Sequence, residues 1–129
     1  MLVTLFHNKP LLNEPGVKES SPSFKPYNEI ITYKNLEIAV LRNVVKKNIY
    51  NDIINNLLLY HKKNVESHKT EIMQYITKLK SKKNTVYKTG IYCMKISVDY
   101  EKLYLDFENY FNLTKKDSEA KKDNNVKLK

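Results

Sequence analysis

The chain has 129 residues, enough for one domain with a modest core and too few for two. Its hydrophobic content of 41% and charged content of 29% are globular, and two glycines with four prolines exclude a low-complexity or fibrous chain. The net charge is +9, yet Arg42 is the only arginine among the 23 basic residues. A charge of this size is compatible with nucleic-acid binding, but two observations weaken that interpretation: the guanidinium fork that clamps phosphates is nearly absent, and an AT-rich genome favours Lys, Asn, Ile and Tyr without any binding role.

The single cysteine, Cys93, excludes an intramolecular disulfide and indicates a reducing compartment. The opening apolar residues are too few for the core of a signal peptide. No stretch approaches the ~20 apolar residues of a membrane span. The sequence therefore predicts a cytoplasmic or nuclear protein with no membrane segment.

In chain order, residues 2–6 form a very short apolar element, and the prolines of 7–26 predict an irregular but ordered loop. The apolar spacing then predicts a helix over 27–45 with a broad buried face, followed by cations and a left-handed cap at 46–48. Two adjacent stripes make up this face: Ile31, Ile38, Leu41 and Val45, beside Tyr33, Leu36, Val40 and Val44.

The clearest helical period in the chain runs over 50–79. It predicts one long helix, or two nearly collinear helices that break between His61 and Asn64. The apolar stripe on this segment indicates core packing. Its members are Tyr50, Ile54, Leu57, His61, Val65, His68, Ile72, Tyr75, Ile76 and Leu79.

Residues 80–90 are expected to form an exposed connection, and the alternation over 91–98 gives a weak strand signal. Asp99 is the expected N-cap of a last helix. The polar residues of 114–129 predict a disordered, Lys-rich tail. The last helix carries an aromatic face made of Tyr100, Leu103, Tyr104, Phe107, Tyr110 and Phe111.

No pattern predicts a catalytic, cofactor-binding or metal-binding residue. His61 and His68 share a helix stripe, but seven helical residues separate them by roughly 10 Å, too far to bind one ion. Cys93 has no second cysteine near it and is expected to be a buried, inert thiol. Gly16 and Gly90 are isolated, so no glycine-rich phosphate loop exists.

One pair of motifs is more specific. The string Asn13-Glu14-Pro15-Gly16 is followed, after a short variable stretch, by a helix start that reads Tyr27-Asn28-Glu29-Ile30. This order resembles the ubiquitin-conjugating enzymes, closest to the branch of the class Z and giant apoptosis-inhibitor enzymes. The resemblance implies that six residues have a structural role, in a loop and at the start of the helix that follows it: Asn13, Glu14, Pro15, Gly16, Tyr27 and Asn28.

The resemblance implies a mainly α chain, the C-terminal helical portion of the family's α+β fold without its N-terminal sheet and active-site region. Residues 1–113 would be a partial domain of this kind and 114–129 the tail. The family's His-Pro-Asn motif and thioester-forming cysteine have no counterpart here, and Cys93 falls in the C-terminal extension. The resemblance therefore implies a truncated conjugating-enzyme-like protein, inactive alone, whose partners are ubiquitin-pathway proteins or a chain that supplies the missing sheet.

Two other functions stay open. A basic helical nucleic-acid-binding protein would use five lysines near Tyr87, and its binding would depend strongly on salt. These lysines are Lys78, Lys80, Lys82, Lys83 and Lys88. The third function is a helical protein-interaction module unrelated to ubiquitin, which a disordered loop at 13–16 would favour.

Overall fold

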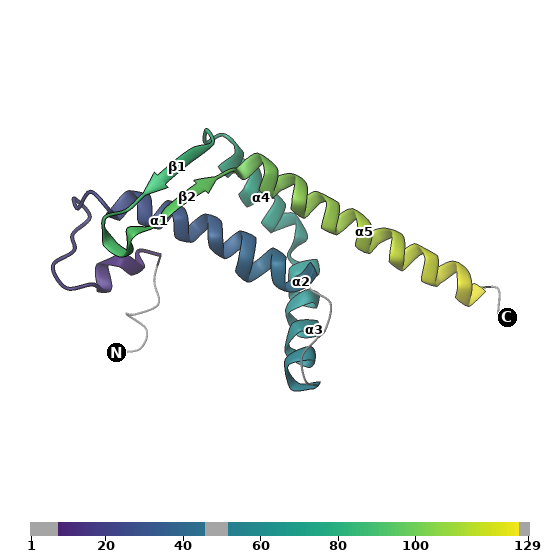
Figure 1. Cartoon of the computed structure of the whole chain (residues 1–129). Coiled ribbons are helices and arrows are strands. Elements are labelled where there is room, and N and C mark those ends of the chain that lie inside the picture. The colour runs from purple at the N-terminus through teal and green to yellow at the C-terminus, as the bar shows by residue number, and fades with distance from the viewer. Residues whose placement is uncertain (1–7, 46–51, 127–129) are drawn as a thin grey trace.

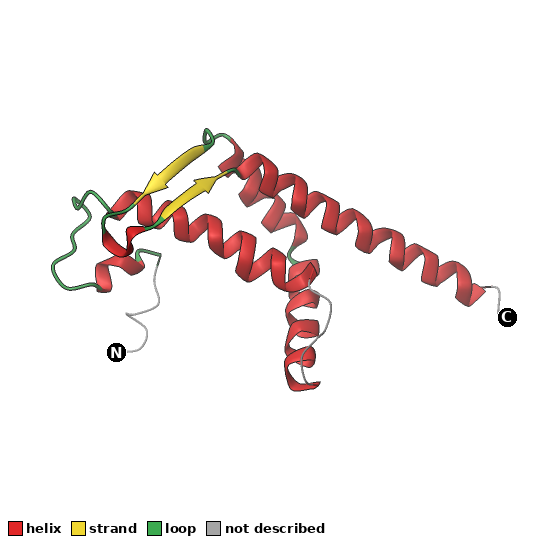
Figure 2. Ribbon diagram, in the orientation of Figure 1, coloured by secondary structure: helices red, strands yellow, loops and turns green. Residues whose placement is uncertain are grey.

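The computed structural model describes the backbone of residues 8–45 and 52–126 and the side chains of residues 8–45 and 54–115. Helices dominate it, which confirms the mainly helical class (Figure 1 and Figure 2). The apolar element expected at 2–6 and the helix cap expected at 46–48 lie outside the described residues.

The first long helix begins three residues earlier than the sequence predicted. After a 3-10 turn, η2 (Pro10–Asn13), helix α1 covers Phe24–Lys34, passes into the π-helical η3 (Asn35–Arg42) and ends in α2 (Asn43–Val45). Pro26 lies inside the first turn of α1. The N–H groups of a first turn have no acceptor within the helix, so the proline removes no helical hydrogen bond there.

The second helical region breaks at His68 rather than between His61 and Asn64. Helix α3 covers Asp52–Ser67, helix α4 covers Lys69–Lys80, and the chain changes direction between them (Figure 1). Three groups crowd the carbonyl oxygen of Asn64: the backbone N–H of His68 at 3.1 Å, the Ser67 hydroxyl at 2.9 Å and His68 Nδ1 at 2.8 Å. Side chains that compete for a helical carbonyl bend a helix, which explains where the break falls.

The segment 80–90 contains a strand, which corrects the expected exposed connection. Strand β1 (Thr85–Lys88) pairs antiparallel with β2 (Lys95–Val98), and Thr85 lies opposite Val98. Residues Ile91–Cys93 form the 3-10 turn η4, so only the second half of the predicted strand is extended. The hairpin packs against α1, where the N–H of Gly90 donates to the Ser23 hydroxyl over 3.1 Å.

The last helix, α5 (Tyr100–Val126), begins as predicted. The backbone N–H of Lys102 donates to Asp99 Oδ1 over 2.9 Å, the geometry of an N-cap. The helix then continues through 114–126, where a disordered tail was expected. No glycine or proline follows Gly90, and Lys, Glu and Ala are good helix formers, so the helix meets no breaker.

The core lies where α5 packs along α4, with η3 and the end of β2 closing it. The predicted aromatic face of α5 is buried except for the half-buried Tyr104. The predicted apolar stripe of α3 and α4 is buried only in part. Ile54 is 39%, Leu57 64% and Tyr75 48% exposed, whereas Val65, Ile76 and Leu79 are buried. Tyr50 lies outside the described residues. The buried cluster consists of Tyr33, Leu41, Val44, Val65, Ile76, Leu79, Val98, Tyr100, Leu103, Phe107, Tyr110 and Phe111.

Candidate functional site

The turn η2, which ends at Asn13 in the first half of the motif, packs against α1. Leu11 in η2 is 1% exposed and anchors this turn, and Gly16 takes a φ of +79°, which glycine adopts without strain. Asn13, Glu14 and Pro15 are exposed, whereas Tyr27 and Asn28 are half-buried in the first turns of α1.

Tyr92 joins the two halves of the motif. Its hydroxyl donates to the Glu14 carboxylate, and this hydrogen bond raises the pKa of Tyr92. Its ring centroid lies 6.0 Å from that of Tyr27. The structure thus brings Glu14 and Tyr27 together through a residue that the sequence assigned to a strand face.

Cys93 is exposed, so the expected buried thiol is wrong. The reason is the turn η4: Tyr92 and Cys93 both have positive φ, at 61° and 47°, which takes the chain out of the extended form. The Cys93 side chain therefore lies on the outside of the hairpin connection, with its Sγ 3.7 Å from the carbonyl oxygen of Gly90.

The two histidines of the apolar stripe contact backbone carbonyls. His61 Nε2 lies 3.2 Å from the carbonyl oxygen of Val40, which ties α3 to η3, and His68 contacts Asn64 at the helix break. Among the residues whose side chains the structure describes, 8–45 and 54–115, no three His, Cys, Asp or Glu residues gather as metal ligands.

The lysines near Tyr87 do not form one open basic surface. Lys82 Nζ contacts both carboxylate oxygens of Glu29, at 2.6 and 2.8 Å. Lys80 Nζ lies 3.8 Å from the Glu101 carboxylate and 4.3 Å from the centroid of the Tyr104 ring. Two of the five lysines that would bind a phosphate backbone, Lys80 and Lys82, therefore already contact carboxylates of this chain.

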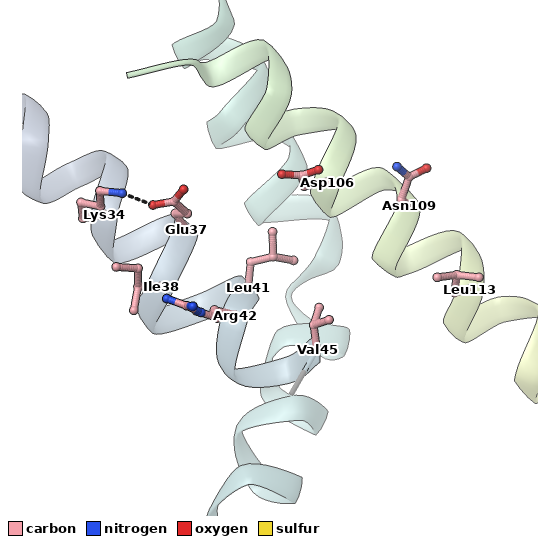
Figure 3. A pocket seen from close by; sticks show the side chains of 9 residues that line it. All are labelled: Lys34, Glu37, Ile38, Leu41, Arg42, Val45, Asp106, Asn109 and Leu113. Carbon is pink, nitrogen blue, oxygen red and sulfur yellow. Dashed lines mark hydrogen bonds and ion pairs between the residues drawn. The ribbon is translucent and has the colours of Figure 1, made fainter. Parts of the chain in front are cut away.

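A groove of about 790 Å³ lies between η3 and α5 and is lined by residues from both sides (Figure 3). Ile38 is 42%, Val45 60% and Leu113 63% exposed. The predicted burial of Ile38 and Val45 is therefore wrong. The lining residues are Lys34, Glu37, Ile38, Leu41, Arg42, Val45, Asp106, Asn109 and Leu113.

Most charges around this groove are paired. Lys34 forms an ion pair with Glu37, and Lys102 Nζ lies 2.9 Å from the Asp106 carboxylate, a contact that raises the pKa of Lys102. Arg42 differs from them. Among the residues that the structure describes, its guanidinium makes no ion pair or hydrogen bond, and its side chain is exposed.

Sequence reasoning missed this groove because it treated both stripes of the first helix as core. The combined width of the two apolar stripes already indicated that part of this face would stay exposed. A face that carries apolar residues on two adjacent stripes is wider than one neighbouring helix covers. Here Tyr33 and Val44 of one stripe and Leu41 of the other are buried in the core, whereas Ile38 and Val45 stay exposed.

Comparisons with protein-family models, with curated proteins and with solved structures find no significant match for this chain. Of the helices that the structure describes, none has both the length and the apolar character needed to cross a bilayer. The interpretation of the groove therefore depends on its own shape and chemistry.

Proposed function

We propose that this chain is a non-catalytic module that binds another protein through the groove between η3 and α5. The observation that carries the proposal is the exposure of three of the four apolar side chains that line it, namely Ile38, Val45 and Leu113. Covering apolar surface contributes roughly 25 cal/mol for each Å² removed from water. Contiguous exposed apolar surface bordered by charges is typical of protein interaction sites.

The chemistry of the lining favours binding over catalysis. The nine residues around the groove include no Ser, Thr, Cys or His, the side chains that most often act as nucleophile or as general base. Two of its carboxylates, Glu37 and Asp106, already accept contacts from lysines. A groove with apolar walls and paired charges can hold a partner segment, and it offers no reacting pair.

The partner class comes from the sequence motif. The likeness of 13–16 and 27–30 to ubiquitin-conjugating enzymes leads us to propose a protein of the ubiquitin pathway as the partner, with this chain acting as a non-catalytic relative of those enzymes. The packing of η2 beside α1 supports treating the two motif halves as one unit. It gives no support to the alternative in which that loop is disordered.

The groove is tested by affinity capture from an extract of the cells that make the protein, with two matched variants. Leu113→Asp places a charge in the groove at a site 63% exposed, and Val86→Asp does the same on β1, at a site 52% exposed and outside the groove. We expect the captured proteins to be lost with Leu113→Asp and kept with Val86→Asp, while circular dichroism shows both variants folded. Capture that is equal for both variants contradicts the proposal.

The absence of conjugating activity is tested separately. The chain is incubated with ubiquitin, its activating enzyme and ATP, and resolved with and without reductant. We expect no reducible adduct. An adduct that disappears in Cys93→Ser would contradict the non-catalytic assignment, because Cys93 is the only thiol in the chain.

A further inference from the structure

The shape of the groove selects a helix as its occupant. Both walls are helical, so their backbone N–H and C=O groups are used within η3 and α5, and an extended strand would find no free edge to pair with. The wall on α5 runs from Asp106 to Leu113, roughly 10 Å or two helical turns. A partner helix lying between the two walls would contact both.

The charge of the groove selects an acidic side chain on that helix. The nearby ion pairs, Lys34 with Glu37 and Lys102 with Asp106, are complete within the chain. In the described part of the chain, Arg42 alone among the charged lining residues has no opposite charge within 4 Å. A partner that covers Arg42 without supplying a carboxylate would remove water from a cation and give nothing in return.

The residue type points the same way. Arg42 is the one arginine among 23 basic residues, in a composition that otherwise uses lysine at every basic position. The guanidinium fork binds a carboxylate through two parallel hydrogen bonds, whereas a lysine ammonium acts as a point charge. The net charge of +9 also favours an acidic partner over a second copy of this chain.

We infer that the groove binds an amphipathic helix of a partner protein and that a Glu or Asp on this helix forms a bidentate ion pair with Arg42. The apolar face of the helix covers Ile38, Val45 and Leu113. Arg42 is then the residue that selects acidic over neutral helices. This inference rests on the proposed function, because it names the occupant of the same groove.

The test uses designed peptides as probes and fluorescence anisotropy as the readout. Each peptide is a labelled helix with Leu at i, i+4, i+7 and i+11; one carries Glu beside this apolar stripe, and its match carries Gln at the same positions. We expect the Glu peptide to bind the wild-type chain about tenfold more tightly than the Gln peptide. Arg42→Gln removes this preference, and Lys88→Gln, on the exposed β1 strand, keeps it.

A charge exchange gives the decisive comparison. Arg42→Glu is expected to weaken binding of the Glu peptide and to strengthen binding of a third peptide that carries Lys at the same positions. Equal binding of the Glu and Gln peptides overturns the carboxylate inference and leaves the groove in place, provided that Leu113→Asp abolishes both. Binding of neither peptide overturns the helix inference, and the capture experiment then decides the proposed function by itself. A dimer of the free chain that Leu113→Asp dissociates also overturns it, because a second copy would then occupy the groove.

Discussion

Alkaline pH should destabilise this protein through its buried tyrosines, and Tyr100 carries the effect most directly. Its side chain is 1% exposed, and burial raises its pKa, with the negative charge of Glu29 adding to the shift. The Tyr100 hydroxyl also donates to Glu29 Oε2 over 3.5 Å. The unfolded chain releases this proton near pH ~10. The folded chain keeps it to higher pH, so the contribution of Tyr100 to stability is complete below pH ~10 and is lost as the pH rises further.

The magnitude follows from proton linkage. One proton held by the folded state and released by the unfolded state lowers the free energy of unfolding by about 1.4 kcal/mol for each pH unit. Tyr100→Phe removes this dependence together with one long hydrogen bond, worth about 1 kcal/mol. The variant should therefore be less stable than the wild type at neutral pH, and its deficit should shrink at alkaline pH.

The assay is urea unfolding followed by circular dichroism at several pH values on both sides of the tyrosine range. Tyr60→Phe is the control, since this side chain is 70% exposed and solvent reaches its hydroxyl in both states. The wild type and both variants contain the same lysines. Subtracting the stability curve of each variant from that of the wild type therefore removes the contribution of lysine titration. Stability curves of the wild type and Tyr100→Phe that stay parallel through the alkaline range would refute the reasoning.

Five further substitutions, at four sites, test the helix cap and the packing by urea unfolding. Asp99→Ala removes the acceptor of the N-cap bond of α5 and should cost about 1 kcal/mol, whereas Asp99→Asn should keep most of it. Phe107→Ala empties a site that is 0% exposed and should cost about 3–5 kcal/mol. Leu105→Ala, at a site 49% exposed on the same helix, should cost about 1 kcal/mol or less, and a cost equal to that of Phe107→Ala would contradict the placement of the core. His61→Phe loses the contact with the Val40 carbonyl and should cost about 1 kcal/mol; an unchanged stability would show that this contact does not hold α3 to η3.

Local signals made the start and the buried face of the last helix predictable. The cap at Asp99 and the aromatic spacing of α5 act within a few residues, so the sequence alone located the helix start and its buried face. The helical class was predictable for the same reason. Strand β1 was missed because it has only four residues, Thr85–Lys88, too few for a clear alternation, and it gains its hydrogen bonds by pairing with β2.

The groove could be predicted only in part. Helical spacing identified Ile38 and Val45 as apolar face residues, and their exposure depends on which neighbour fails to cover them. That neighbour is set by the path of α5, which packs on α4 and leaves η3 open. Leu113 was assigned to no face, and Arg42 stood out by residue type alone. Arg42 and Leu113 line the same groove only because of how the helices pack in the tertiary structure.

The central claim is that the groove between η3 and α5 is the binding surface. A photoreactive phenylalanine analogue placed at Asn109, which is exposed and lines the groove, tests it directly, with the same analogue at Val86 on β1 as the control. After irradiation in the cell extract, we expect a discrete cross-linked protein from position 109 that is absent from position 86 and lost when Leu113→Asp is added. Adducts that are the same from both positions, or that survive Leu113→Asp, would contradict the account.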